Sequence, residues 1–175
     1  MFTDVFKVPA ICLCESGGKP WPQFASVKTY DPTKEPLRIT WAGLHVGRKA
    51  VQLALEAVAK IGDEFPIEFT VIGAGPEYKN WRALAERLGI TDKVIWTGEV
   101  PHDDAVARMA KAHVFAFPSL LEASSTVTLE ALSVGLPVIC HDACGMSAIV
   151  NDSCGVKIPM VSPEVSIDGY VKALR

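Results

Sequence analysis

The sequence lacks a long apolar run and a block of basic residues. Its apolar runs are interrupted within about ten residues, too short to cross a bilayer, so we expect no transmembrane segment. The chain carries 17 Lys and Arg against 20 Asp and Glu, a net charge of −3, and no Lys/Arg cluster marks a nucleic-acid surface. These absences exclude nucleic acid as an expected partner. They leave one ordinary globular domain of 175 residues.

The amino terminus has little of what a secretory signal needs. Residues 8–14 form a short apolar stretch closed by Glu15, without the basic start, longer run and cleavage site of a signal peptide. This pattern favours a buried strand. The five cysteines are an odd number, which favours free thiols in a reducing compartment, so we expect a cytoplasmic protein. Those near the carboxyl end match no familiar zinc spacing, and no metal site is predicted.

Apolar runs and segments of helical spacing alternate from Leu37 onward. The expected strands are Arg38–Trp41, Ile67–Ile72, Val94–Thr97, Val114–Phe117, Pro137–Cys140 and Val156–Ile158. The intervening helices end at glycines or follow prolines and aspartates, as helix termini do. The alternation predicts an α/β fold, a doubly wound, Rossmann-like parallel sheet. Residues 1–36 are then an N-terminal segment or linker with one candidate strand, and residues 37–175 form the folded domain.

Ligands of such folds bind beyond the carboxyl ends of the strands, so the loops there are the candidate site. The first, residues 43–49, combines a glycine turn with Arg48 and Lys49 at a helix start, which suits a diphosphate. The same residues would also fit a solvated surface. The second, Gly73-Ala-Gly75, begins like a dinucleotide fingerprint, with Glu99 as a candidate ribose-binding acid, but Tyr78 replaces the third glycine.

The loop after the fourth strand carries the most information. Glu122 and Glu130 lie eight residues apart, and Glu130 shares a helix face with Thr126. The free N–H groups near residues 125–127 form a second anion cradle, and a carboxylate one turn deeper can bind the two hydroxyls of a ribose. Alternatively, each glutamate is an ordinary surface residue. Of the histidines, we expect His45 to belong to a candidate site loop and His102 to face solvent before a helix.

Four motifs taken in order resemble the donor-binding half of family 4 retaining glycosyltransferases, one half of a GT-B fold. They are Gly43…Arg48-Lys49, Val71-Ile-Gly-Ala-Gly-Pro-Glu77, Trp96-Thr-Gly-Glu-Val-Pro101, and Pro118-Ser…Glu122 with Glu130-Ala-Leu-Ser-Val-Gly-Leu-Pro-Val-Ile139. The resemblance runs from Leu37 to the end of the chain. It implies transfer of a sugar from a nucleoside-diphosphate sugar, with retention of configuration, no bound metal ion and no further cofactor, in processes such as polysaccharide biosynthesis.

The resemblance also implies a role for each candidate residue. Glu122 would be catalytic, meeting the donor sugar near the reacting centre, and Glu130 would hold the ribose. The donor diphosphate would be bound by Gly43, Arg48, Lys49, Thr126 and Val127. The sugar and base would be enclosed by His45, Gly73, Gly75, Gly98, Glu99, Val100, Ala123, Ser124 and Ser125.

The sequence departs from the family in three respects. Leu44 stands where many members have arginine, and Ala123-Ser124-Ser125 stands where many have Gly-Phe-Gly. Residues 1–36 are too few for the family's N-terminal acceptor domain, and the last helix is cut short. We therefore expect a fragment that binds donor with little or no transfer activity. The alternatives are an NAD-binding oxidoreductase domain, weakened by the absent third glycine, and a non-catalytic Rossmann-like module that binds a protein.

Overall fold

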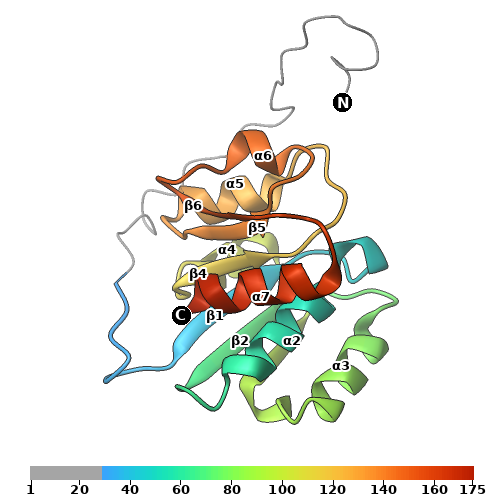
Figure 1. The fold of residues 1–175 in the computed structure, drawn as a ribbon, viewed down its shortest axis with the longest axis vertical. Coiled ribbons are helices and arrows are strands. Elements are labelled where there is room, and N and C mark those ends of the chain that lie inside the picture. Colours follow the sequence, from blue (N-terminus) through green and yellow to red (C-terminus); the bar gives the residue numbers. More distant parts are fainter. Residues whose placement is uncertain (1–28) are drawn as a thin grey trace, which may run out of the picture.

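The computed structural model describes residues 29–175, which form a six-stranded parallel sheet between two layers of helices (Figure 1). The strand order is β3-β2-β1-β4-β5-β6. This order reverses direction between β1 and β4, as in a doubly wound fold. The strands are β1 (Leu37–Ala42), β2 (Ile67–Ile72), β3 (Val94–Gly98), β4 (Val114–Phe117), β5 (Val138–His141) and β6 (Gly155–Ile158).

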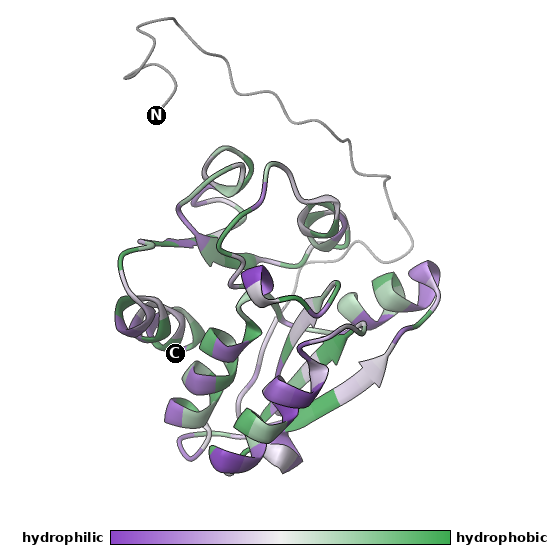
Figure 2. Ribbon diagram, turned by 90° about the vertical axis from the view of Figure 1, so that its right-hand side faces the viewer, coloured by the Kyte–Doolittle hydropathy of each residue, from purple (hydrophilic) through white to green (hydrophobic). Residues whose placement is uncertain are grey.

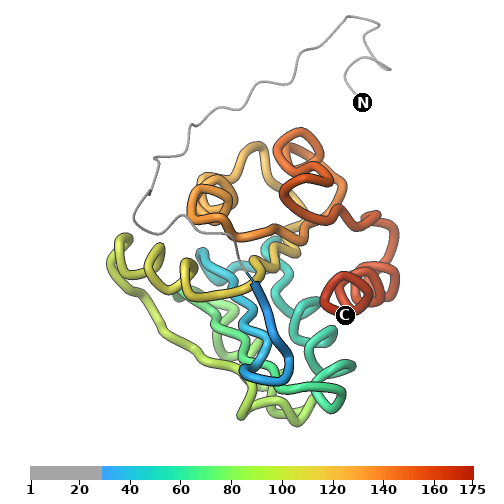
Figure 3. Tube along the Cα trace, turned by 90° about the vertical axis from the view of Figure 1, so that its left-hand side faces the viewer, coloured from blue at the N-terminus to red at the C-terminus, as the bar shows by residue number. Residues whose placement is uncertain are grey.

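Helices lie on both faces of the sheet (Figure 3), and β4 is apolar throughout, as expected of a strand covered on both sides. The strands β1 and β2 instead alternate, with Arg38, Thr40, Glu68 and Thr70 between their apolar residues. α2, α3 and α7 lie on one side, and α4 and α5 lie on the other (Figures 1 and 3). Hydrophobic segments face the strands and hydrophilic ones lie outside (Figure 2). The helices are α2 (Val51–Ile61), α3 (Tyr78–Arg87), α4 (His102–Met109), α5 (Thr126–Ser133), α6 (Met146–Ile149) and α7 (Pro163–Leu174), with short 3-10 turns at Gly47–Lys49 and Thr91–Lys93.

The core lies mainly along β1, β2 and β4. Trp41, Phe69 and Phe117 are fully buried there. The helix α2 buries most of its residues, because it packs against the sheet on one side and against α7 on another. The aromatic and branched side chains of this core hold the carboxyl ends of the strands in place, and the loops that follow them carry the candidate site.

The two halves of the sheet meet along a short seam. β1 pairs with β2 along its full length, from Leu37↔Ile67 to Ala42↔Ile72. By contrast, its pairing with β4 is confined to Ile39↔Val114 and Thr40↔Phe115. Beyond those pairs the loops that follow the two strands are joined by a hydrogen bond from the Leu120 N–H to the Arg48 carbonyl at 2.8 Å, at the candidate site.

The predicted fold class and all six predicted strands are confirmed, with ends that differ by a residue or two at most. One helix starts later than its proline indicated: α3 begins at Tyr78, two residues after Pro76. The candidate strand at residues 8–14 lies outside the described residues. Between residues 29 and 175 there is no helix long and apolar enough to span a bilayer.

Candidate functional site

Two cations and one carboxylate meet at the carboxyl end of the sheet. Arg48 and Lys49 belong to the turn that follows β1, and Glu122 belongs to the loop between β4 and α5. Arg48 Nη1 and Lys49 Nζ each lie 2.6 Å from Glu122 Oε1. Arg48 Nη1 also donates to the Leu121 carbonyl at 2.9 Å. Because β1 and β4 are neighbours, the fold brings together residues more than seventy positions apart, and the cluster keeps one excess positive charge.

The Lys49–Glu122 pair is largely buried, with side chains 11% and 9% exposed. Burial by itself raises the pKa of Glu122, but hydrogen bonds from Lys49 and Ser119 and the charges of both cations outweigh it and lower that pKa below its ordinary value. Lys49 Nζ also lies 5.2 Å from the centre of the Phe117 ring, a cation–π contact. All three donors reach Oε1, and within residues 29–175 Oε2 has no hydrogen-bond partner. The second oxygen is therefore available to accept a ligand hydroxyl.

Gly73 and Gly75 allow two loops of the candidate site to pack closely together. A Cβ on Gly73 would lie 2.1 Å from the Gly43 carbonyl oxygen, and one on Gly75 would lie 2.6 Å from the His45 carbonyl oxygen. Both glycines also have φ angles, +115° and +150°, that side chains rarely allow. The backbones of the two loops are joined by a hydrogen bond from His45 N to the Ala74 oxygen. Protein backbone thus occupies the space above these glycines.

The side chain of His45 does not line an open pocket, in contrast to its sequence-based assignment. It is fully buried, with ring centres 5.0 to 6.2 Å from those of four aromatic residues, Trp41, Tyr78, Trp81 and Trp96. Burial lowers the pKa of His45 and keeps the ring neutral. Its role in the site is to anchor the turn that leads to Arg48 and Lys49.

Gly98, Glu99 and Val100, at the end of β3 and directly after it, are expected to help enclose the sugar and base. Gly98 accepts a hydrogen bond from the Gly73 N–H at 2.9 Å, which joins this segment to the preceding loop. Glu99 is exposed and Val100 is half-buried against the core. The carboxyl-end loops of β1, β2 and β3 therefore form one connected wall.

The amino end of α5 forms the opposite wall. Ser125 caps the helix: its Oγ accepts from Thr128 N at 3.3 Å and from the Thr128 hydroxyl at 2.9 Å. This cap places the Thr126 and Val127 amides in the first turn, where the helix dipole favours an anion. One turn further, Glu130 Oε1 lies 2.8 Å from His102 Nε2, and this hydrogen bond raises the pKa of His102.

A hollow of about 650 Å³ opens directly beside Glu122. Its lining includes the predicted catalytic residue Glu122, the predicted diphosphate-binding Arg48 and two predicted residues of the sugar pocket, Ala123 and Ser124. It also includes residues that were not predicted, Leu121, Cys144 and Gly145. Gly145 is required there, because a Cβ would lie 1.9 Å from the Ala123 carbonyl oxygen. The loop after β5 thus forms the floor of the pocket.

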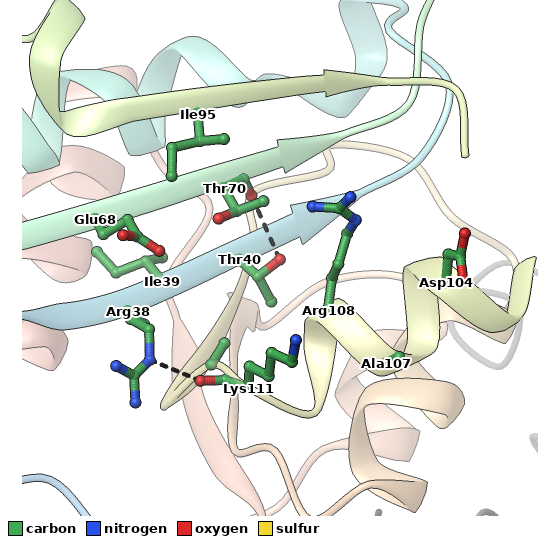
Figure 4. A pocket seen from close by; sticks show the side chains of 11 residues that line it. Arg38, Ile39, Thr40, Glu68, Thr70, Ile95, Asp104, Ala107, Arg108 and Lys111 are labelled. Atoms are coloured by element: carbon green, nitrogen blue, oxygen red, sulfur yellow. Dashed lines mark hydrogen bonds between the residues drawn. The ribbon is translucent and has the colours of Figure 1, made fainter. Parts of the chain in front are cut away.

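A second hollow, of about 380 Å³, lies away from this site, between α4 and strands β1 to β3 (Figure 4). Arg108 projects from α4 over Thr40 and Thr70, and Arg38 Nε donates to the Lys111 carbonyl at 2.8 Å. None of the residues predicted from the sequence lines it. Its walls combine exposed basic and acidic side chains without a buried, unpartnered polar group, so it gives no evidence of a ligand site.

Sequence reasoning missed three polar residues around Glu122 and Glu130. Ser119, which the motif includes, donates its hydroxyl to Glu122 Oε1 at 2.6 Å. His102 is exposed, as expected, but also hydrogen-bonds Glu130, and His141 of β5 binds the Ser119 carbonyl. No group of His, Cys, Asp and Glu within residues 29–175 is arranged to hold a metal ion. The described cysteines, Cys140, Cys144 and Cys154, are free thiols, and burial raises the pKa of Cys140 to about 12.

Comparison with known proteins identifies the family of the chain. The family model described as "Glycosyl transferases group 1" matches residues 27–174. Lipopolysaccharide glucosyltransferase WaaG of Escherichia coli is 32% identical over 119 residues, which cover 66% of this chain and 31% of that protein. Sulfoquinovosyl transferase SQD2 of Arabidopsis thaliana is 33% identical over 133 residues, which cover 75% of this chain and 25% of that protein. This chain therefore spans about a quarter to a third of the length of these relatives.

Solved structures show the same fold. The crystal structure of WaaG superposes with a TM-score of 0.72 at 25% identity, covering 90% of this chain and 46% of that one. The pneumococcal O-GlcNAc transferase GtfA, solved in complex with UDP and GlcNAc, superposes with a TM-score of 0.71 at 19% identity. The match covers 86% of this chain and 31% of that one. Both neighbours support a Rossmann-like, GT-B-type domain.

Proposed function

The chain belongs to the glycosyl transferases group 1 family, and we propose that it binds the nucleoside-diphosphate sugar donor of a retaining glycosyltransferase. The observation that carries this proposal is the meeting of Arg48, Lys49 and Glu122 on one carboxylate oxygen. These residues come from two loops on either side of the switch in strand order, where ligands of such sheets bind. Neither the dinucleotide fingerprint nor a protein-binding module uses all three.

Each charged group has a task in donor binding. Lys49 and Arg48 supply positive charge for the diphosphate, and the amino end of α5 supplies backbone N–H groups at Thr126 and Val127. Oε2 of Glu122 accepts a hydroxyl of the sugar that fills the hollow beside it. Glu130 accepts the two ribose hydroxyls. In this proposal Glu122 keeps the side chains of Arg48 and Lys49 in position before the donor binds.

The chemistry follows from the leaving group. In the transfer, the bond from the sugar's anomeric carbon to the diphosphate oxygen breaks, and a bond to the acceptor oxygen forms on the same face, while the acceptor's proton passes to the departing diphosphate oxygen. Negative charge grows on the departing nucleoside diphosphate, so donors aimed at it lower the barrier. We propose that Arg48 and Lys49, which both contact Glu122 Oε1, provide this stabilisation without a bound metal ion.

The acceptor is assigned to another part of the parent enzyme. We infer this from the share of its relatives' length that the chain spans. Relatives named for lipopolysaccharide and for O-antigen chains support a setting in polysaccharide biosynthesis. The three free thiols support a reducing compartment such as the cytoplasm.

Calorimetric titration of the chain with UDP, GDP, ADP and NAD, with and without magnesium, tests the proposal. We expect one nucleoside diphosphate to bind irrespective of magnesium, and binding to weaken at least tenfold in Lys49→Ala, because a charge-assisted hydrogen bond is lost. Lys111→Ala is the matched control, since Lys111 is an exposed lysine of the remote hollow. Tight binding of NAD, or equal affinity of the two variants, would contradict the proposal.

A further inference from the structure

Glu122 is held by more than its two cations. Ser119, which follows β4 and is 5% exposed, lies 2.6 Å from Glu122 Oε1 through its hydroxyl. The same hydroxyl lies 3.3 Å from the Arg48 carbonyl, a longer contact. A hydroxyl has a single proton to donate, and the shorter contact to a carboxylate takes it. The position of Ser119 therefore determines whether Glu122 keeps this donor.

Ser119 is in turn held by the last residue of β5. His141 is 1% exposed, and its Nδ1 lies 3.2 Å from the Ser119 carbonyl oxygen. A carbonyl only accepts hydrogen bonds, so Nδ1 carries the proton of the ring. Burial lowers the pKa of His141, which favours the neutral ring, so its other nitrogen is an acceptor.

That acceptor has a buried partner on another helix. Ser166 of α7 is 2% exposed, and its hydroxyl lies 2.9 Å from His141 Nε2. The serine donates this hydrogen bond, because the nitrogen has no proton. A donor at Nε2 stabilises the tautomer that keeps the proton at Nδ1, much as a second partner fixes a histidine beside a metal or a nucleophile.

We propose that His141 is a positioning residue for Glu122, acting through Ser119, with its tautomer fixed by a hydroxyl of α7. The consequence for donor binding rests on the proposed function. The ring holds the backbone of a serine whose side chain holds the carboxylate, so loss of the Nδ1 donor lets that serine shift and removes one of three donors from Oε1. Glu122 Oε2 then no longer has a fixed direction toward the sugar.

A purely structural role is the alternative, and a neighbouring contact provides its control. Tyr170, also on α7, donates its hydroxyl to the Ile139 carbonyl of β5 at 3.3 Å. Like the His141–Ser166 contact, this hydrogen bond is buried and joins α7 to β5. Tyr170 makes no hydrogen bond to Ser119 in the described residues. Its ring lies edge-on to that of His141, with 6.0 Å between the ring centres, and phenylalanine keeps this ring contact. Tyr170→Phe therefore measures what loss of an α7–β5 hydrogen bond does without the connection to Glu122.

Nuclear magnetic resonance of the full chain tests the proposal without a ligand. Ring ¹⁵N shifts of His141 should show the proton at Nδ1, and Ser166→Ala should introduce the other tautomer. In carboxyl ¹³C titrations, His141→Gln should raise the pKa of Glu122 toward its ordinary value. His141→Asn should retain the lowered pKa, because the asparagine amide can replace the Nδ1 donor. Tyr170→Phe should leave it unchanged.

Two results would overturn the proposal: a proton at Nε2 in the wild-type ring, or equal pKa values of Glu122 in His141→Gln and Tyr170→Phe. Thermal unfolding checks that each variant is folded. If His141→Gln does not fold, Ser166→Ala is judged by the ring shifts and by the same titration, in which an unchanged tautomer and an unchanged pKa of Glu122 together reject the proposal.

Ligand binding adds a separate measurement. His141→Gln should lose about tenfold in affinity for the nucleotide sugar, since one hydrogen bond is no longer positioned, and little for the parent nucleoside diphosphate. Equal losses for both ligands would contradict a role toward the sugar. If the wild-type chain bound neither ligand, the proposed function would fail, and the carboxyl titration would still decide whether His141 positions Glu122.

Discussion

Lys49 and Glu122 form a largely buried ion pair in which Nζ lies 2.6 Å from Oε1, although the two residues are far apart in the sequence. The pair joins the turn after β1 to the loop after β4 across the point where the strand order reverses. The contribution of this ion pair to the free energy of unfolding should therefore be measurable without any ligand.

Replacement of Lys49 by methionine should destabilise the protein. The substitution keeps the side-chain length but removes one of three donors to a buried carboxylate, which costs about 1–3 kcal/mol. Urea denaturation at neutral pH measures this loss. Lys60→Met is the matched control, because its ion pair with Asp168 is exposed, with side chains 50% and 69% exposed, and such pairs contribute about 1 kcal/mol or less. Equal losses of unfolding free energy in the two variants would show that the buried pair contributes no more to stability than the exposed one.

The contribution of Glu122 to stability should depend on pH. Burial opposes its ionisation, yet the hydrogen bonds and charges around it lower its pKa in the folded state below the ordinary value of 4.5. A lowered carboxyl pKa stabilises the protein above the ordinary value, and the stabilisation is lost as pH falls through the lowered pKa. The difference in unfolding free energy between wild type and Glu122→Gln should thus shrink as pH decreases below 4.5. A difference that stays constant or grows would contradict the charge environment described.

Gly73→Ala should be far more destabilising than an ordinary glycine replacement. The new Cβ would lie 2.1 Å from the Gly43 carbonyl oxygen, so two backbone segments would have to separate. Gly89→Ala is the control: it also has a positive φ, +69°, but nothing lies within 4 Å of its Cβ. We expect about 1 kcal/mol for Gly89→Ala and a several-fold larger loss for Gly73→Ala in urea denaturation. Similar values would show that the loops adapt.

Glu130→Gln should reduce the discrimination between ribose and deoxyribose. A carboxylate accepts from both hydroxyls of a ribose, whereas an amide replaces one acceptor with a donor. We expect the wild-type chain to bind a nucleoside diphosphate about tenfold more tightly than its 2′-deoxy analogue, and the variant to bind both alike. Calorimetry provides the comparison, with Glu86→Gln on the exposed face of α3 as control. If the variant kept the preference of the wild-type chain for ribose over deoxyribose, Glu130 would not be the ribose-binding residue.

The fold was predictable because its strands are short, apolar and separated by clear turn signals. Val114–Phe117, for example, is bounded by Pro118, and the structure ends β4 there. The Arg48, Lys49 and Glu122 cluster was also predictable, since parallel strands align their carboxyl-end loops. Helix starts were less clear: α3 begins after Pro76 and Glu77 rather than at the proline.

The roles of His45 and the two loop glycines could not be read from the chain order. Glycine after a strand permits close approach of any backbone, and the sequence does not reveal whether ligand or protein approaches. Likewise, a histidine in a site loop faces a pocket or the core depending on aromatic residues far along the chain, here Trp81 and Trp96. The link from His141 to Ser119 is hidden for the same reason, because it depends on the packing of α7.

The short pairing between β1 and β4 has a mechanical consequence. The two strands are paired only at Ile39↔Val114 and Thr40↔Phe115 in the described chain. Beyond these pairs the Leu120 N–H donates to the Arg48 carbonyl at 2.8 Å, and the ion pairs to Glu122 span the same joint. The joint between the two halves of the sheet is thus short and partly electrostatic. A ligand that binds Lys49 on one side and the amino end of α5 on the other would strengthen this joint, so amide exchange along the seam should slow when the site is filled.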